Sequence, residues 1–288
     1  MKVAHSVGEL GPRERAVAIG TFDGVHIGHQ RVIAAAVETG LVPTVVTFDP
    51  HPRLALGYGV ELLSTLARRL ELFAAHGVAE TLVVRFDHDL QQREPEDFAR
   101  DVLGALGTVV VVAGETFRFG HRRRGDLALL RELGFDARAV PFLEGISSTE
   151  IRRLLHEGDV AAAAPMLGRP AEVEGTVVVG DERGGTLGFP TANLAVEPQL
   201  LVPAFGIYAG SALGHPAAVS IGTNPHYGGL ERKIEAFLLD FEGDLYGQRL
   251  VVELWQRLRD ERAFESEQAL IDQIARDVEA TRAATRPG

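Results

Sequence analysis

Near the start of the chain, the segment GTFDGVHIGHQ, from Gly20 to Gln30, has the residue types needed to bind a nucleotide. Its glycines let the backbone approach a ligand closely, and the free amides at a helix start favour a phosphate. His26 and His29 are three residues apart, and both can donate hydrogen bonds to phosphate oxygens as charge develops during nucleotidyl transfer. The alternative is that both histidines are surface or helix-capping residues without a catalytic role. The predicted contacts with a nucleotide phosphate here are Gly20, Phe22 and Gly28, and His26 and His29 are candidate catalytic residues.

A second segment, GDERGGTLGFPTANL, runs from Gly180 to Leu194 and predicts a phosphate loop. Its glycines permit a tight turn lined by amides, and Pro190 fixes the backbone just before Thr191 and Asn193. These two side chains offer neutral oxygens, which suit the hard Mg²⁺ of a metal–ATP complex. The alternative is a glycine-rich hairpin followed by a turn, and the absence of G-K-[ST] argues against a P-loop kinase. The predicted phosphate-binding residues are Gly180, Gly184 and Gly188, and the predicted metal ligands are Thr191 and Asn193.

A carboxylate further along the chain supplies a candidate general base. Phosphoryl transfer to an alcohol needs a group that accepts the hydroxyl proton and holds the nucleophile in line. Glu235 lies in KIEAFLLDF, where strand alternation places it on the same side as Phe237 and Leu239. A carboxylate among apolar neighbours is unusual unless it faces a site, so Glu235 is predicted to be catalytic.

The composition excludes several kinds of chemistry and indicates where the protein is located. The 288 residues are 45% hydrophobic and 24% charged, enough for a sizeable core and two domains, which we expect at 1–165 and 166–288. The absence of cysteine excludes disulfides and thiolate catalysis. A net charge of −11 argues against nucleic-acid binding, and no apolar run approaches the roughly 18 residues of a membrane helix. We therefore expect a cytoplasmic protein with neither nucleic acid nor membrane as a partner.

The basic run 121–124 is either a solvated loop or a contact for a ligand phosphate or carboxylate.

The elements that must position these residues follow from the periodicity. Between Arg15 and Pro141, short β-rich runs alternate with helix-length segments, which predicts a parallel, Rossmann-like α/β sheet covered on both faces. Two helices are expected after Thr149, with a break at LGRPAEVEG. From Gly175 to about Leu258, short alternating strands with turn signals predict a small antiparallel β-barrel. Apolar residues at helical spacing over 264–284 predict a terminal helix that packs across that barrel.

The N-terminal motifs resemble those of the nucleotidyltransferase superfamily. The strand, glycine turn, H-x-G-H pair and later run ISSTEIR carry this resemblance. It implies direct attack on the α-phosphate of a nucleoside triphosphate, and a helix start at Ser148 and Thr149 that holds the triphosphate with Arg152. An ordinary Ser/Thr helix cap is the alternative, but it accounts for one hydroxyl alone.

Two further segments look like the flavin-specific branch of that superfamily. These are TFDPHP, from Thr47 to Pro52, and GETFRFG, from Gly114 to Gly120. They imply that Asp49 and Phe117 contact a flavin. Thr116 departs from the Asp or Asn usual in the branch, and this change bears on how the acceptor is positioned and on adenylylation.

The PTAN tetrapeptide and its glycine loop closely resemble riboflavin kinases, in which the glutamate at the position of Glu235 is the base. The run SIGTNPHYGG, from Ser220 to Gly229, continues the likeness, and Tyr227 is a candidate to stack on the flavin ring, with a plain core role as the alternative. Phe237 and Gly185 stand where this family often has His and Arg.

Taken together, the chain is similar from about Ala16 to Asp277 to the bacterial bifunctional riboflavin kinase and FMN adenylyltransferase (FAD synthetase) family. The resemblance implies phosphorylation of riboflavin to FMN and adenylylation of FMN to FAD, with riboflavin, FMN and ATP as substrates. It implies Mg²⁺ with ATP as co-substrate, and no tightly bound organic cofactor. The alternatives are a riboflavin kinase with an impaired adenylyltransferase domain, or a non-catalytic flavin-binding protein. Nothing in the residues indicates an oligomeric state.

Overall fold

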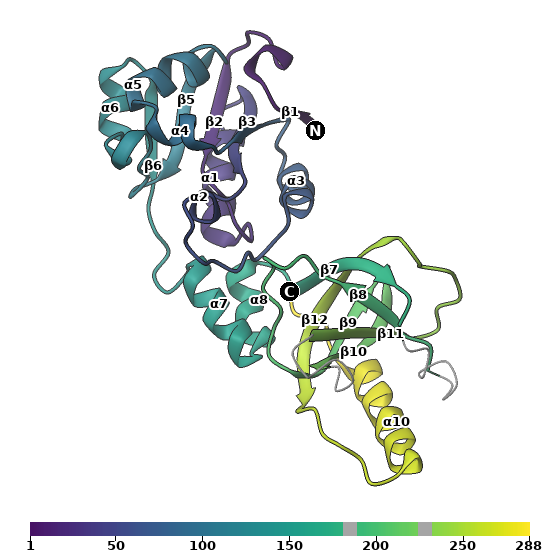
Figure 1. The fold of residues 1–288 in the computed structure, drawn as a ribbon. Helices are drawn as coiled ribbons and strands as arrows, with labels where there is room; N and C mark the ends of the chain where they lie inside the picture. The colour runs from purple at the N-terminus through teal and green to yellow at the C-terminus, as the bar shows by residue number, and fades with distance from the viewer. Residues whose placement is uncertain (181–188, 224–231) are drawn as a thin grey trace. The chain divides into compact units, whose positions relative to one another are not determined.

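A computed structural model describes residues 1–180, 189–223 and 232–288. The chain divides into two compact units, Met1–Ser148 and Thr149–Gly288, and Figure 1 shows the elements of each. None of the helices in these described ranges combines the length and the apolarity needed to span a bilayer.

The first unit is built on a six-stranded sheet in which every pair of neighbours is parallel (Figure 1). The strand order is β1-β4-β3-β2-β5-β6. The predicted parallel α/β sheet is therefore confirmed, and β1 is an additional edge strand. The strands are β1 (Lys2–Ala4), β2 (Arg15–Ile19), β3 (Val42–Asp49), β4 (Glu80–Arg85), β5 (Thr108–Gly114) and β6 (Asp136–Val140).

Helices and helical turns cover both faces of this sheet. Along β2, Val17 and Ile19 belong to one buried cluster and Ala16 and Ala18 to the other, as strand alternation requires. The helices are α1 (Ile27–Val37), α2 (Pro52–Ala55), α3 (Leu66–Ala75), α4 (His88–Gln92), α5 (Pro95–Phe98) and α6 (Leu127–Glu132), with short turns η1 (Val7–Glu9), η2 (Ala99–Gly104) and η3 (His121–Arg123).

The strand order reverses direction beside β2. The chain runs from β2 to β3 on one side of it, and β5 pairs with its other side. Open α/β sheets bind ligands beyond the carboxyl ends of their strands at such a reversal. The segments that follow β2, β3 and β5 all leave from this edge, and they are the ones that the motifs single out.

The second unit begins with α7 (Ser148–Glu157, whose first residue closes the other unit) and α8 (Val160–Leu167), and continues into a closed six-stranded barrel. All neighbouring strands of the barrel are antiparallel, in the order β10-β11-β8-β7-β12-β9, so the predicted barrel is confirmed. The strands are β7 (Ala171–Val178), β8 (Ala192–Ala195), β9 (Gly206–Ala212), β10 (His215–Thr223), β11 (Arg232–Leu238) and β12 (Arg249–Arg259).

Two details of the barrel differ from expectation. The segment read as a break holds the first half of β7, and the PTAN motif runs into a strand, β8, where a turn was expected. Gly175 explains the first difference, because a Cβ there would lie 2.6 Å from the carbonyl oxygen of Ala195. Glycine at this position allows β7 and β8 to approach closely instead of marking a turn.

The terminal helix α10 (Glu267–Ala283) contacts β9 and β10, but its most buried residues are polar. Gln273, Asp277 and Thr281 form this buried stripe at intervals of four residues. Asp277 accepts hydrogen bonds from Arg259 of β12 (2.7 Å) and from Gln273 (2.8 Å). The helix is therefore attached through a satisfied polar network as well as through the partly buried apolar residues that its periodicity indicated.

Candidate active sites

The residues that follow β2 form a strained turn, Gly20–Val25, which we call the nucleotide turn. Phe22 and Val25 adopt φ values of 53° and 42°, and Gly24 adopts 78°, all in the left-handed region. A Cβ at Gly20 would lie 3.2 Å from the Phe22 ring, so glycine leaves room for that ring. Non-glycine residues in this region cost free energy and concentrate at ligand sites. The turn leads directly into α1.

His26 and His29 lie together where α1 begins. His26 is the N-cap, and its Nδ1 accepts a hydrogen bond from the backbone N–H of His29 (3.4 Å), so that in the neutral ring Nε2 carries the proton. The two rings stack with centroids 3.6 Å apart. A Cβ at Gly28 would lie 3.1 Å from Cε1 of His26, so glycine makes room for that ring.

The imidazole of His29 is held neutral. Burial, and secondarily the neighbouring His26, lower the pKa of His29 well below its usual 6.5. Its Nδ1 is buried and has no hydrogen-bond partner among the described residues. A neutral imidazole can still donate one hydrogen bond to phosphate, and it does so without the cost of burying a charge.

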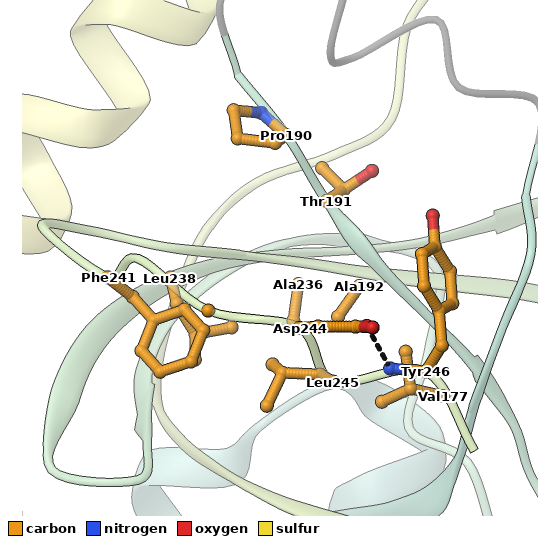
Figure 2. Close-up of a pocket in the computed structure, with 11 residues that line it drawn as sticks. Val177, Pro190, Thr191, Ala192, Ala236, Leu238, Phe241, Asp244, Leu245 and Tyr246 are labelled. Atoms are coloured by element: carbon orange, nitrogen blue, oxygen red, sulfur yellow. Dashed lines mark hydrogen bonds between the residues drawn. The ribbon is translucent and has the colours of Figure 1, made fainter. Parts of the chain in front are cut away.

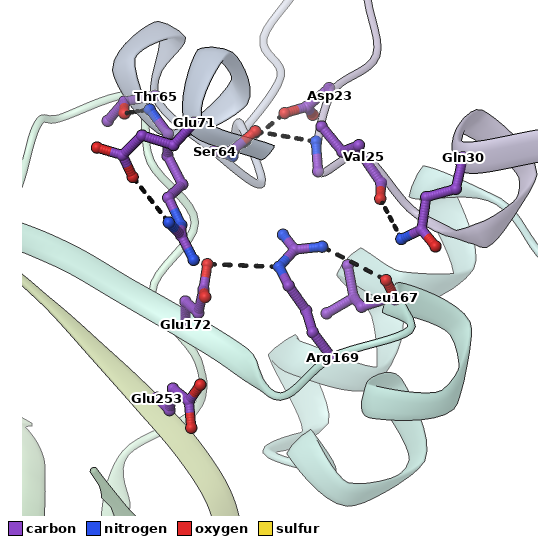
Figure 3. Close-up of polar contacts among 12 residues, drawn as sticks. Asp23, Val25, Gln30, Ser64, Thr65, Glu71, Leu167, Arg169, Glu172 and Glu253 are labelled. Atoms are coloured by element: carbon purple, nitrogen blue, oxygen red, sulfur yellow. Dashed lines mark hydrogen bonds and ion pairs between the residues drawn. The ribbon is translucent and has the colours of Figure 1, made fainter. Parts of the chain in front are cut away.

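Residues at the start of α3 hold the nucleotide turn in place, and the motifs did not identify them. The carboxylate of Asp23 accepts from the N–H groups of Leu63 (2.9 Å) and Ser64 (3.3 Å), and the Ser64 hydroxyl accepts from Gly24 N–H (2.9 Å). Figure 3 shows Ser64 beside Asp23. Arg69, one turn into α3, donates to the Thr21 carbonyl (2.8 Å). No spacing rule connects positions 40 and 48 residues apart, so only the folded chain reveals them.

The neighbouring strand ends carry the candidate acceptor residues. Asp49 is the last residue of β3 and its carboxylate is exposed, 3.7 Å from Nη2 of Arg69. Phe117 follows β5 and stacks on Phe119 with centroids 5.5 Å apart, packed against the core. Thr116 is exposed. The structure therefore brings Asp49 to the nucleotide turn through Arg69, and places Phe117 partly within the core.

The basic run 121–124 follows the same strand end. Arg122 and Arg123 are exposed and adopt φ values of 51° and 59°, whereas Arg124 forms an ion pair with Glu94. At least one of these arginines therefore has a protein partner.

Of the ISSTEIR residues, Ser148 closes the first unit. Its hydroxyl donates to the carbonyl of Asp23 (3.3 Å), so it contacts the nucleotide turn. Thr149 and Arg152 follow on α7 and belong to the second unit, in which Ile151 of the same helix is buried.

In the barrel, Glu235 lies beside the PTAN residues. It pairs in register with Asn193 of β8, and its Oε1 accepts from the Thr191 hydroxyl (3.4 Å) and lies 3.2 Å from Nζ of Lys233. Along β11, Ile234, Ala236 and Leu238 are buried, whereas Lys233, Glu235 and Phe237 are partly exposed. Glu235 and Phe237 therefore share one side of β11, as strand alternation predicted, and this is the partly exposed side; Leu239 lies beyond the end of the strand. The structure places Glu235 next to Thr191 and Asn193.

A cavity of about 360 Å³ opens beside Thr191 (Figure 2). Its walls come from β7, β8, β11 and the connection between β11 and β12, where Asp244 accepts from the backbone N–H of Tyr246 (2.9 Å). Thr191 thus lines the cavity and also contacts Glu235. The lining residues are Val177, Pro190, Thr191, Ala192, Ala236, Leu238, Phe241, Gly243, Asp244, Leu245 and Tyr246.

Comparison with known families decides which chemistry these two sites belong to. Residues 10–149 match the FAD synthetase family and residues 167–285 match the riboflavin kinase family. A bifunctional riboflavin kinase/FMN adenylyltransferase from Listeria monocytogenes is 37% identical, with 93% of this chain and 92% of the relative covered. The chain belongs to this bifunctional family. Its members are enzymes, and both matched domains are enzymatic.

Other relatives cover the chain equally well. The family member from Escherichia coli is 38% identical, with 96% of each chain covered. A crystal structure described as a macrolide-efflux protein from Streptococcus pneumoniae superimposes with a TM-score of 0.86 at 30% identity, covering 98% of this chain and 99% of that one. The two-unit fold is thus shared along the whole chain.

The PTAN residues of this family member fit a magnesium–nucleotide complex. Asn193 is 8% exposed, and its Oδ1 has no hydrogen-bond partner among the described residues. An unpaired buried oxygen two residues from the Thr191 hydroxyl is a suitable ligand for a hard cation. The described ranges contain no cluster of three or more His, Asp or Glu that could hold a metal by itself, which suits an ion that keeps waters and ATP oxygens as its other ligands.

The close approach of the backbone at Gly180 to this amide requires a glycine. A Cβ at Gly180 would overlap the side-chain amide of Asn193. Three other predicted contacts, Gly184, Gly188 and Tyr227, lie outside the described residues.

Proposed function

We propose that this protein phosphorylates riboflavin to FMN with ATP, and then adenylylates FMN to FAD with a second ATP and release of pyrophosphate. We assign the adenylyltransferase to residues 1–165 and the kinase to residues 166–288. The observation that carries the kinase assignment is the Thr191–Glu235 contact beside the unpaired Oδ1 of Asn193. It puts a proton acceptor next to two oxygen ligands for a metal-bound triphosphate.

In the kinase step, Glu235 accepts the proton of the ribityl 5′-hydroxyl as its oxygen attacks the γ-phosphorus, and ADP leaves. Thr191 holds the Glu235 carboxylate through its hydroxyl. Gly180, Gly184 and Gly188 would provide backbone amides for the phosphates, with Tyr227 against the flavin. Mg²⁺, held by Thr191 and Asn193, would neutralise the developing phosphate charge when bound.

In the adenylyl step, the FMN phosphate attacks the α-phosphorus of ATP, and pyrophosphate leaves. His26 and His29 donate hydrogen bonds to the oxygens on which charge develops, and backbone amides of the nucleotide turn add to them. Gly20, Phe22 and Gly28 shape this cradle, and Ser148, Thr149 and Arg152 are proposed to hold the triphosphate. Asp49 and Phe117 would contact the flavin.

The test is incubation of the purified protein with riboflavin, ATP and magnesium, followed by chromatographic separation of the flavins. We expect riboflavin to be consumed, FMN to rise and then fall, and FAD to accumulate with an equal amount of pyrophosphate. Unchanged riboflavin would contradict the kinase proposal. Omission of the magnesium from the same assay tests whether the reaction requires it.

A second candidate is a riboflavin kinase with an impaired adenylyltransferase, and Thr116 is the observation that favours it. This side chain is exposed after β5, where the flavin-specific branch usually carries Asp or Asn. FMN without any FAD in the same assay would select this candidate. A non-catalytic flavin-binding protein would convert nothing, although it would have no use for the Glu235 carboxylate beside Thr191. Cytoplasmic location and the absence of nucleic-acid and membrane partners stay predictions.

A further inference from the structure

Arg69 is a buried cation at the centre of the first unit's ligand edge. It is 2% exposed, and it lies one turn into α3. One guanidinium nitrogen, Nη1, donates to the Thr21 carbonyl (2.8 Å) and lies 3.4 Å from the Thr47 hydroxyl. The other, Nη2, lies 3.7 Å from the Asp49 carboxylate. A single side chain thus joins the nucleotide turn after β2 to the end of β3.

The environment of Arg69 shows that its position is costly. Burial lowers the pKa of the guanidinium, and the carboxylates of Asp23 and Asp49 partly oppose this effect. Its Nε is buried with no hydrogen-bond partner among the described residues. Burying a charge with an unused donor destabilises a fold. The position of Arg69 therefore suggests that it serves a purpose other than stability.

The Thr21 carbonyl is the group that Arg69 fixes. It also accepts from the Thr47 hydroxyl (3.2 Å), so two donors hold it. The Thr21–Phe22 peptide is trans, and in a trans peptide the following N–H points opposite to the carbonyl. The Phe22 N–H therefore points away from Arg69, and it donates to no group in the described part of the chain. An amide fixed in this way is a donor available to a ligand.

We infer that Arg69 is a positioning residue for adenylyl transfer. By anchoring the Thr21 carbonyl, it aims the Phe22 amide at the ATP phosphates. By contacting Asp49, it sets the distance between the ATP phosphates and the flavin acceptor. This inference rests on the proposed adenylyltransferase function. It assigns a role to a residue that no motif marks, and Arg69 touches neither substrate.

Arg15 offers a matched comparison because it is the first residue of β2, at the opposite end of this strand from the nucleotide turn. It is also fully buried, and it donates to Glu80 (2.8 Å) and to the carbonyls of Leu10 (3.1 Å) and Gly11 (2.9 Å). Removing either arginine takes a buried cation from the first unit. Only Arg69 contacts the nucleotide turn.

The first experiment compares Arg69→Met with Arg15→Met in FAD formation from supplied FMN and ATP, with thermal unfolding of both. We expect kcat to fall about 10- to 100-fold for Arg69→Met, somewhat less than the loss of a whole oxyanion donor. Arg15→Met should lower the unfolding temperature but keep kcat within about threefold of the wild type. In both variants FMN formation from riboflavin checks that the barrel is intact. Equal losses of kcat in the two variants would overturn the inference.

The second experiment separates positioning from folding by chemical rescue. In Arg69→Ala, guanidinium chloride at tens of millimolar should restore FAD formation at least fivefold, with sodium chloride and urea at the same concentrations as controls. If the alanine and methionine variants fail to fold, Arg69→Lys replaces them in the same assay. This variant keeps the charge, but its side chain cannot reach both Thr21 and Asp49. Absence of rescue together with full activity of Arg69→Lys would overturn the inference. Wild-type protein that makes no FAD would instead overturn the proposed function.

Discussion

At the scale of single residues, the imidazole of His29 links protonation to stability. Because burial lowers its pKa, the folded first unit disfavours the imidazolium, whereas the unfolded chain takes up a proton near pH 6.5. The unfolded state then binds more protons between the folded pKa and 6.5, so stability falls as the pH falls through this window.

This reasoning gives a prediction for pH dependence. From pH 8 to pH 5, the unfolding free energy of the first unit should decrease below about pH 6.5, with a His29 contribution of at most about 1.4 kcal/mol per pH unit. The variant His29→Gln should lose this contribution, and His88→Gln, which alters an exposed histidine, should keep it. Urea unfolding at each pH measures the difference. Parallel curves for the wild type and His29→Gln would contradict the prediction.

Gly180 supports a prediction about the kinase site. Because a Cβ here would overlap the Asn193 amide, Gly180→Ala must displace either the backbone at position 180 or the proposed metal ligand. We expect at least an approximately tenfold loss of kcat/KM for FMN formation, equivalent to about 1.4 kcal/mol of transition-state stabilisation. FAD formation from supplied FMN should remain unchanged and serves as the internal control. Wild-type kinase activity in this variant would show that Asn193 has room to move.

At the scale of elements, α10 shows how a helix is attached by polar contacts. Its sequence has apolar residues at helical spacing, and these are half-buried, but Asp277 and Gln273 lie deeper. Hydropathy alone does not reveal this arrangement, because the arginine that neutralises Asp277 comes from β12, 18 residues earlier.

The polar network predicts that mutation of a buried polar residue of α10 lowers the unfolding free energy more than mutation of an exposed one. Asp277→Ala leaves the guanidinium of Arg259 without its carboxylate, and removal of one partner of a buried pair costs about 3–5 kcal/mol. Glu279→Ala alters an exposed residue of the same helix and should change the unfolding free energy by less than about 0.5 kcal/mol. Chemical denaturation of both variants makes the comparison. Similar stabilities would mean that the pair is already solvated.

At the scale of the whole molecule, the two proposed chemistries should be separable by mutation. Glu235→Gln removes the proton acceptor, and FMN formation should fall about 100-fold or more while supplied FMN is still converted to FAD. His29→Ala should show the reverse pattern. An equimolar mixture of the two full-length variants should convert riboflavin to FAD, because FMN released by one protein is a substrate for the other. Loss of both activities from either folded variant would contradict two separate sites.

Local sequence was sufficient for the fold class and for the positions of most elements. Strand and helix periodicities give short-range signals, so the parallel sheet, the barrel and the terminal helix could be predicted from them. The histidine pair, PTAN and Glu235 were proposed as site residues because their residue types and spacing are informative within one segment. The strand β8 was missed since PTAN reads locally as a turn, and it becomes a strand only by pairing with β7 and β11.

Contacts between distant segments were decided only by the tertiary structure. The attachment of the nucleotide turn to Ser64 and Arg69, and the contact of Thr191 with Glu235, join residues 40 to 48 positions apart. The outward direction of Glu235 likewise depends on which face of β11 the barrel encloses. Spacing along a chain reports only what lies on one helix face or one strand. The enclosure of one site by several strands is a property of the closed fold.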